Sequence, residues 1–464
     1  MRQPRPVGRH ENSITVKGPV MQQESNKQPE SRGVSRRGFI KTSAAVGAAS
    51  LFAASRYAYA QGSDTIRVGL IGCGGRGTGA GIIDCATSSK GVELVAIGDL
   101  FQDHVDTAPA RIKHNLAGRK LPVDEIYKVT PETTFAGWDA CEKVIACDLD
   151  MVILTTPPYF RPMQFKAAIA AGKHVFTEKP IAVDPAGVRD FIATSKKAEE
   201  KGLSVMPGTQ MRRARHIMAI VERLHEGGIG EVLAGQCVRR GGGLMGWYPE
   251  AMERKPEWSD MEWQLRRWLF VTWLSGDFIV EQHVHNLDLV NWVMGGPPVQ
   301  CVAQGGRQVR TGPAYGNVFD HFAGEYEYAN GARIGYLGVQ TDGVSGRCDQ
   351  RFVGPKGRAH FDFGIARIDG DAPWTYEGES VEPAVQEYAD LIAGIREGKP
   401  INEGVQVAES TMTAIMARMS AYTGRALKWD WVMKASELDL GPEKLEFGDL
   451  PLESVALPGT TKLI

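Results

Sequence analysis

Short apolar runs alternate with amphipathic stretches between residues 65 and 206 of the chain. The runs are rich in Val, Ile and Leu, which is typical of strands buried on both faces of a parallel sheet. The predicted strands are Thr65–Ile71, Leu94–Gly98, Asp150–Thr155, Lys173–Thr177 and Leu203–Met206. Helices are predicted at Arg161–Ala171 and from Asp184, as N-cap before Pro185, to about Lys201. This alternation predicts an α/β fold with helices on both faces of a parallel sheet.

The pattern changes after residue 210, where β-rich segments follow one another. The predicted strands are Val232–Arg239, Val299–Gly305, Phe319–Tyr328, Ala332–Gln340, Arg351–Gly354 and Arg358–Phe363. Two helices are then predicted at Pro383–Glu397 and Val405–Thr423, and we expect the second to pack back across the domains. We therefore predict two domains, at residues 61–210 and 211–464.

A glycine-rich turn follows the first predicted strand and opens a helix. Its sequence is Gly72-Cys73-Gly74-Gly75-Arg76-Gly77. In this context the GxGxxG spacing is typical of dinucleotide binding: the glycines allow a tight turn, close approach to a pyrophosphate and close helix packing. Asp99 comes 22 residues after the last glycine, where an acidic residue is expected to bind ribose hydroxyls. A glycine-rich turn without a ligand is the alternative.

We expect NAD rather than NADP as the cofactor. The Asp99 carboxylate would accept hydrogen bonds from both ribose hydroxyls and repel a 2′-phosphate, and no basic residue follows it directly. Further residues fall at the carboxyl ends of later strands, where ligands of such sheets bind, so we expect them to line the same crevice. They are Thr156, Pro157, Glu178 and Lys179.

The first 60 residues have a different composition. Met1–Val34 is polar and predicted to be disordered, and it precedes a twin-arginine sequence, an apolar run at Thr42–Ala54 and an A-x-A site at Ala58–Ala60. The apolar run is too short to span a membrane, so this order predicts a twin-arginine (Tat) signal peptide and export to the periplasm by the Tat machinery. Because that route carries folded proteins, we expect the cofactor to be acquired before export and held tightly.

Charge and cysteine usage exclude some classes of protein. Without residues 1–60, which hold ten basic and three acidic residues, the formal charge of −2 becomes about −9, and no basic face for nucleic acid is expected. The seven cysteines are scattered and form no CxxC pair, so we expect reduced, mostly buried thiols and no metal site. No later run predicts a transmembrane segment.

The chemistry of the second half is concentrated in residues 276–288. If Glu281–Met294 is helical, then Glu281, His285 and Asp288 share one face, while His283 points about 200° away, which argues against a two-histidine metal site. The polar face of a surface helix is the alternative. A lysine at the other side of the crevice, Lys179, could stabilise the alkoxide that forms when a carbinol loses its proton.

The strand with GxGxxG, the T-P strand end and the tripeptide Glu178-Lys179-Pro180 together resemble the glucose–fructose oxidoreductase/inositol dehydrogenase/MocA family. The resemblance covers the chain from about Thr65 onward. It implies a Rossmann domain followed by an α+β domain with an open, mostly antiparallel sheet. It also implies oxidation or reduction of sugars and polyols with NAD or NADP, and a dimer or tetramer.

The family's D-x-x-x-H pattern corresponds to Glu281 and His285, with a glutamate in place of the aspartate. The resemblance implies that His285 acts as general base and Lys179 stabilises the oxyanion, while Glu281 orients the imidazole or touches a substrate hydroxyl. Where relatives carry a histidine after the T-P strand end, this chain has Tyr159 and Arg161. Further candidate substrate contacts are Arg213, His283 and Asp288, besides aromatic residues of the loop at residues 241–259.

Three functions fit these residues. The first is an exported NAD-dependent oxidoreductase acting on a sugar, polyol or glycoside. The second is a hydrolase or lyase of the same fold that cleaves glycosides through transient oxidation and leaves bound NAD unchanged overall. The third is a sugar-binding protein without catalysis.

Overall fold

The computed structural model describes residues 65–243 and 253–464. The predicted leader, with its twin-arginine sequence, and the central part of the aromatic loop lie outside the described residues. Within the described part, no helix combines the length and the apolar character needed to cross a membrane.

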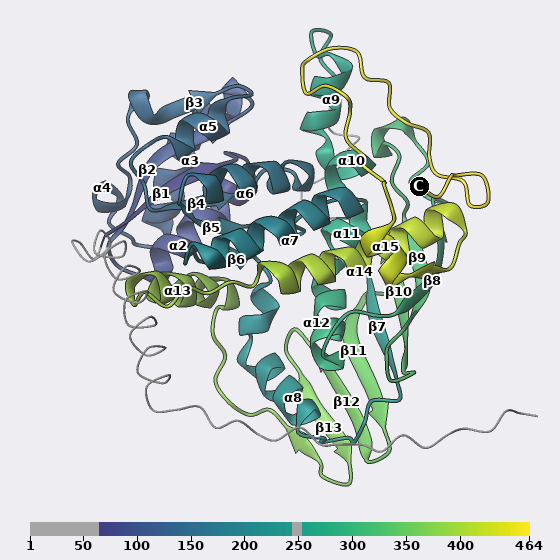
Figure 1. The fold of residues 1–464 in the computed structure, drawn as a ribbon. Coiled ribbons are helices and arrows are strands. Elements are labelled where there is room, and N and C mark those ends of the chain that lie inside the picture. The colour runs from purple at the N-terminus through teal and green to yellow at the C-terminus, as the bar shows by residue number, and fades with distance from the viewer. Residues whose placement is uncertain (1–64, 244–252) are drawn as a thin grey trace, which may run out of the picture. The chain divides into compact units, whose positions relative to one another are not determined.

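The first sheet has six parallel strands in the order β3-β2-β1-β4-β5-β6 (Figure 1). The strands are β1 (Ile66–Ile71), β2 (Val92–Asp99), β3 (Thr134–Ala136), β4 (Met151–Leu154), β5 (His174–Thr177) and β6 (Val205–Pro207). This is the doubly wound order of a Rossmann domain, and it places the strand order reversal between β1 and β4, beside the glycine-rich turn. The predicted parallel sheet is confirmed, although β3 was not predicted.

Helices cover both faces of this sheet. They are α2 (Ile82–Ser88), α3 (Gln102–Gly118), α4 (Val123–Ile126), α5 (Ala140–Ile145), α6 (Arg161–Ala170) and α7 (Pro185–Glu200), with the short helices η1 (Gly77–Gly81), η2 (Pro131–Thr133) and η3 (Pro158–Phe160). Helix α7 begins as predicted, with the Asp184 carboxylate accepting from the backbone N–H of Gly187 at 2.8 Å. Alternate strand residues pack on α5, α6 and α7 or on α2 and α3, as expected for a sheet buried on both sides.

The second sheet has nine strands in the order β14-β13-β12-β11-β7-β10-β9-β8-β15. All neighbours are antiparallel except β7 and β10. The strands are β7 (Ala234–Gly241), β8 (Gln300–Gly306), β9 (His321–Glu327), β10 (Arg333–Gln340), β11 (Arg347–Gly354), β12 (Gly357–Asp362), β13 (Ala366–Gly370), β14 (Trp374–Thr375) and β15 (Leu427–Lys428). This mostly antiparallel sheet is the one that the family resemblance implies.

Helices pack on one face of the second sheet, among them α8, α12 and α14 (Figure 1). The remaining helices are α8 (Arg215–His225), α9 (Asp260–Arg266), α10 (Thr272–Ser275), α11 (Phe278–Glu281), α12 (Val284–Met294), α13 (Pro383–Arg396), α14 (Gly404–Thr423) and α15 (Trp429–Lys434), with short helices η4 (Gln210–Arg213), η6 (Trp268–Phe270) and η7 (Pro313–Tyr315). Along β10 the residues alternate between buried and more exposed, as expected for a sheet covered on one side.

Both long helices near the end of the chain contact the first domain. Helix α14 lies between α7 and strand β8, so it bridges the two sheets. Helix α13 packs on the first sheet beside α2, where Tyr388 stacks on Phe176 of β5 with ring centroids 4.1 Å apart. The packing of α14 across the domains was predicted. Helix α13 also packs on the first domain.

Candidate functional site

The glycine-rich turn closes tightly on the edge of the first sheet. A Cβ atom added at Gly77 would lie 2.1 Å from the carbonyl oxygen of Gly72, so only glycine allows this approach of helix and strand. Gly72 itself has φ +101°, a conformation that other residues rarely adopt. By contrast, Cβ atoms at Gly74 and Gly75 would meet nothing within 4 Å, so open space lies over these two residues.

Asp99 ends β2 beside this turn, and backbone donors hold its carboxylate. Oδ2 accepts from the N–H of Cys73 at 2.7 Å, and Oδ1 accepts from the N–H of Phe101 at 2.9 Å. The imidazole Nδ1 of His104 lies 3.2 Å from Oδ1. The carboxylate therefore has a fixed orientation at the carboxyl end of its strand.

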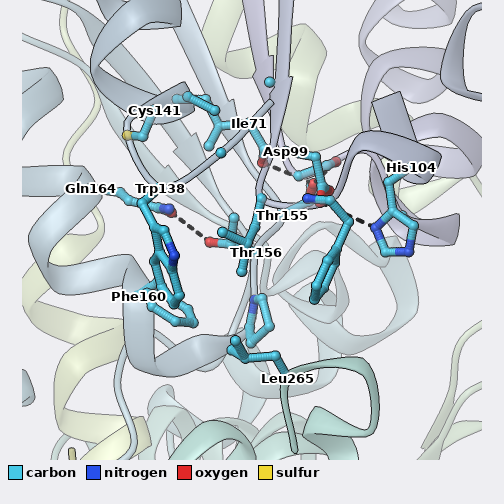
Figure 2. A pocket seen from close by; sticks show the side chains of 18 of the residues that line it. Ile71, Asp99, His104, Trp138, Cys141, Thr155, Thr156, Phe160, Gln164 and Leu265 are labelled. Carbon is cyan, nitrogen blue, oxygen red and sulfur yellow. Dashed lines mark hydrogen bonds and ion pairs between the residues drawn. The ribbon is translucent and has the colours of Figure 1, made fainter. Parts of the chain in front are cut away.

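A cavity opens between these groups, as Figure 2 shows. Asp99 and His104 lie on one side of it, and Trp138 and Phe160 lie on the other. Thr155, Thr156 and Pro157 from the end of β4 also line it, and the second part of the chain contributes Leu265 and Trp268. The ends of β1, β2 and β4, which the sequence predicts to share a crevice, meet here, whereas Glu178 and Lys179 after β5 do not line this cavity.

The Glu178-Lys179-Pro180 loop after β5 is tied to its neighbours by two arginines. Arg76 of the glycine-rich turn pairs with Glu178, Nε to Oε1 at 2.6 Å. Arg161 is buried, and its guanidinium donates to the carbonyl oxygens of Thr156 at 2.9 Å and Pro180 at 2.6 Å. Arg161 therefore holds two site loops together and is not exposed as a substrate contact.

Lys179 reaches from this loop to the second part of the chain. Its Nζ donates to the carbonyl oxygen of Glu281 at 2.5 Å and to Oε1 of the same residue at 3.1 Å. Both side chains are about nine-tenths buried. Burial lowers the pKa of Lys179, and the carboxylates of Glu281 and Glu178 oppose this shift.

His285 lies on α12, one turn beyond Glu281. Its Nδ1 is buried without a hydrogen-bond partner, and so is Oε2 of Glu281. Burial lowers the pKa of His285 well below its usual range, and the positive charges of Lys179, Arg239 and Arg76 add to the shift. Burial and these charges therefore favour the neutral form of the imidazole.

The helix expected at Glu281–Met294 is interrupted, which corrects the predicted arrangement. Helix α11 ends at Glu281, and α12 begins at Val284 after a turn at residues 282 and 283. Glu281 and His285 therefore do not share one continuous helix. The interruption has a consequence for the site, because carbonyl groups at a helix end lack intrahelical donors and the Glu281 carbonyl accepts from Lys179 instead.

Other sequence-predicted substrate residues are engaged inside the protein. Nδ1 of His283 lies 2.5 Å from the Tyr336 hydroxyl, and the ring is buried. Asp288 accepts two hydrogen bonds at 2.8 Å from Arg212 and one at 2.7 Å from Ser410. These contacts tie helices to the sheet and to each other, so we assign His283 and Asp288 structural roles.

Arg213 and Tyr159 are placed similarly. Arg213 pairs with Asp390 at 2.8 Å and with Glu403 at 2.6 Å, so its charge joins α13 to the end of β6. The half-buried Tyr159 packs edge to face on Trp273, and its hydroxyl lies against Gly441. Both side chains are thus engaged by other residues of the protein.

The sequence analysis missed the aromatic and cationic surroundings of Asp99. Trp138 follows the unpredicted strand β3; had that strand been recognised, its carboxyl end would have placed Trp138 at the same edge. Arg266 of α9 lies over Phe101, 4.0 Å from the ring centroid, and pairs with Asp103 and Glu262. It comes from a distant part of the sequence, so no local signal indicates it.

The cysteines form no disulfide within the described residues. All seven are free thiols, and five of them are buried. Within residues 65–243 and 253–464, no group of three or more His, Cys, Asp or Glu side chains is arranged to hold a metal ion.

Two family models match the chain. Residues 66–208 match the oxidoreductase family with an NAD-binding Rossmann fold, and residues 217–360 match the GFO/IDH/MocA C-terminal domain. A putative myo-inositol dehydrogenase from Sinorhizobium meliloti has a similar structure, with a TM-score of 0.54 and 20% identity over 78% of this chain and 99% of that chain. The aldose-aldose oxidoreductase from Caulobacter crescentus has a TM-score of 0.59 and 18% identity over the same shares.

The curated relatives match over shorter lengths. The 2,7-anhydro-N-acetylneuraminate hydratase of Escherichia coli is 30% identical over 39% of this chain and 44% of its own length. A glycosyl hydrolase family 109 protein of Shewanella putrefaciens is 29% identical over 38% of this chain and 35% of its own length. This chain therefore spans less than half the length of either relative. The two family models, one on each sheet and together covering more than half of the residues, show that the chain belongs to the Gfo/Idh/MocA family of oxidoreductases.

Proposed function

We propose that this protein is an exported, NAD-dependent oxidoreductase that acts on a hydroxyl group of a sugar, polyol or glycoside. The observation that carries the proposal is the buried contact of Lys179 with Glu281, close enough to His285 for the lysine charge to lower the pKa of an imidazole whose Nδ1 has no hydrogen-bond partner. A proton donor and a proton acceptor thus lie at the edge of a dinucleotide-binding sheet.

The residues present fit a dinucleotide. Gly74 and Gly75 leave open space where a pyrophosphate would approach the backbone, and Asp99 lines the cavity beside them. Gly72, Gly74, Gly75, Arg76 and Gly77 would hold the phosphates, with Thr156, Pro157, Glu178 and Lys179 along the rest of the cofactor. A bound nicotinamide ring supplies the hydride acceptor or donor for the reaction.

Residues of the chain itself then remove the proton of the substrate hydroxyl group and stabilise the charge left on its oxygen. Neutral His285 accepts the proton of a substrate hydroxyl, and the Lys179 ammonium stabilises the negative charge that develops on the oxygen. Glu281 keeps Lys179 in place and, through the charge of its carboxylate, favours the protonated amine despite burial. We propose this last role instead of orientation of the imidazole, because the contact that the carboxylate makes is to Lys179.

NAD is preferred over NADP in this proposal. A 2′-phosphate would lie beside the Asp99 carboxylate, whose orientation is fixed by two backbone donors. The nearby cation Arg266 already pairs with two carboxylates, so little of its charge remains for a phosphate.

The proposal of export rests on the sequence of residues 35–60. Export favours a cofactor that stays bound, because free NAD is scarce outside the cytoplasm.

We also propose that the protein self-associates. The uncovered face of the second sheet carries the exposed apolar side chains Val302, Leu337 and Val353, which supports such a contact.

A second candidate function is redox-assisted cleavage or hydration of a glycoside, with NAD recycled in the site. It is favoured by the names of two relatives, a 2,7-anhydro-N-acetylneuraminate hydratase and a glycosyl hydrolase family 109 protein. The same lysine and histidine would act in the oxidation step with which this series of reactions begins.

The test begins with mass spectrometry of nucleotide released from the purified native protein. The holoprotein is then incubated with panels of sugars, polyols and nitrophenyl glycosides. A stoichiometric change in absorbance at the NADH wavelength indicates net oxidation, whereas aglycone release without net NADH indicates the redox-neutral reaction. Protein that neither contains nor binds NAD would contradict both functions.

A further inference from the structure

The last part of the chain packs on residues that form the walls of the cavity beside Asp99. Residues 438–450, here called the strap, follow α15 and are anchored at both ends. The backbone N–H of Leu440 donates to Asp184 Oδ2 at 3.0 Å. At the other end, Gly448 accepts from the Met261 N–H at 3.1 Å, and Leu450 accepts from the Gln264 side chain at 2.5 Å.

Apolar side chains fix the strap to the walls of the cavity. Leu440, Leu445 and Leu450 pack on a cluster of buried residues. That cluster contains Phe101 and Phe160 from the first domain together with Leu265 from α9, and all three line the cavity. The strap is therefore packed on the outside of the nucleotide cavity, at the point where the two parts of the chain meet.

Phe447 joins two opposite walls of this cavity. Its ring stacks on Phe101 with centroids 6.2 Å apart and lies 5.3 Å from the ring of Trp138. Phe101 follows β2 and Trp138 follows β3. These neighbouring strands are joined at their ends by the Gly137 N–H, which donates to the Asp99 carbonyl oxygen at 3.0 Å, and Phe447 adds a side-chain contact between the two rings. Phe447 is 45% exposed, and within the described residues its aromatic contacts are those with Phe101 and Trp138.

We propose that the strap is a third part of the cofactor site and that Phe447 is a positioning residue for it. This proposal rests on the proposed function only in so far as NAD occupies the cavity. Because Asp99 binds the adenosine ribose in such folds, the adenine lies between the walls that Phe447 connects. By holding Phe101 and Trp138 together, Phe447 slows the release of the cofactor.

The strap lies outside both regions that match the family models, which end at residue 360. If the protein is exported with its cofactor bound, a lost cofactor is not readily replaced. An element that slows the release of the cofactor is then an advantage. The two recognised domains build the cavity, and the strap ties its walls together so that the adenosine half leaves slowly.

The experiment measures the dissociation rate of NAD from the full-length holoprotein, displaced by excess fluorescent etheno-NAD. Phe447→Ala is expected to release NAD about 3- to 10-fold faster, the range that loss of aromatic packing predicts. Phe447→Trp keeps an aromatic ring and is expected to restore slow release. The matched control is Phe363→Ala, because Phe363 is 51% exposed and lies beyond β12, away from the cavity.

Fragments of the cofactor locate the effect. In nucleotide-free protein, Phe447→Ala should weaken binding of AMP and leave nicotinamide mononucleotide unchanged. Thermal unfolding of each variant separates fold from function: a variant that unfolds earlier but releases NAD at the wild-type rate overturns the proposal. Equal losses for AMP and nicotinamide mononucleotide also overturn it. By contrast, slow NAD release without any carbohydrate turnover would refute the proposed function, while the proposal that the strap slows NAD release would stand.

Discussion

The Nζ atom of Lys179 donates to both the carbonyl and the carboxylate oxygen of Glu281, a residue 102 positions further along the chain. The lysine follows a strand of the first sheet, and the glutamate ends a helix beside the second. Buried pairs of this kind are costly to break, because removal of one partner leaves an uncompensated charge. The contact therefore fixes where the two halves of the site meet.

The first prediction concerns the two groups that handle the proton. Lys179→Met and His285→Asn should each lower turnover of the carbohydrate substrate by about 10²- to 10⁴-fold, because each removes a positioned proton donor or acceptor. Bound NAD, measured by mass spectrometry, should remain in both. Lys166→Met is the control, since that lysine side chain is 60% exposed. Near-normal turnover in either site variant would rule out the assigned role.

Much of the first domain could be predicted because its signals are local. The glycine spacing, the apolar strands and the Asp184–Pro185 helix start each depend on a few neighbouring residues. Strand β3, with only three half-buried residues, has no such signal. The meeting of Lys179 with the second half was expected only through the family resemblance.

The errors arise where tertiary packing decides the outcome. No proline or glycine marks the interruption at residues 282 and 283, so a single helix from Glu281 was the natural prediction. Arg161, Arg213 and Asp288 are charged residues of a kind usually exposed, but each is engaged by partners far away in sequence. The strap has no hydrophobic periodicity at all, and its role emerges only from its contacts.

A second prediction concerns the pH dependence of turnover. Burial lowers the pKa of Lys179, and the Glu281 carboxylate opposes that shift. Glu281→Gln removes the opposing charge, so the pKa of Lys179 should fall further. If the protonated amine is required, the alkaline limb of the kcat profile should move to lower pH by about one unit or more.

The profile is measured with the wild type, with Glu281→Gln and with the control Glu226→Gln, an exposed residue at the end of α8. The control should match the wild type. An alkaline limb that stays in place, or moves to higher pH, in Glu281→Gln would contradict the electrostatic role of this carboxylate.

A third prediction concerns the choice between NAD and NADP. Asp99→Ser removes the carboxylate that we propose faces the ribose, so NAD should bind about 10- to 100-fold more weakly, as for lost hydrogen bonds to a charged group. The affinity for NADP should fall less than that for NAD, or rise, because the repulsion between the carboxylate and the 2′-phosphate disappears. Calorimetric titration with both nucleotides measures the ratio. Asp106→Asn, an exposed position on α3, is the control, and an unchanged ratio in Asp99→Ser would count against the assignment.

The last prediction concerns stability and uses a histidine away from the site. His174 begins β5, and its Nδ1 accepts from the backbone N–H of Ser204 at 2.9 Å, so the folded protein requires the neutral ring. Burial lowers the pKa of His174 to about 4, against about 6.5 in an unfolded chain. Below pH 6.5 the unfolded chain therefore takes up a proton that the folded protein does not, and this lowers the free energy of unfolding as the pH falls.

Between pH 7 and 4.5 this histidine alone should lower the free energy of unfolding by about 2 kcal/mol. His174→Asn keeps an acceptor near the position of Nδ1 and cannot titrate. Between pH 7 and 4.5 the free energy of unfolding of this variant should therefore fall by about 2 kcal/mol less than that of the wild type. Urea unfolding at each pH measures the two slopes, with the exposed His114→Asn as a control that should follow the wild type. Parallel slopes for the wild type and His174→Asn would show that the buried ring is not held neutral. Because other buried groups titrate in both proteins alike, the difference between the two slopes isolates the contribution of His174.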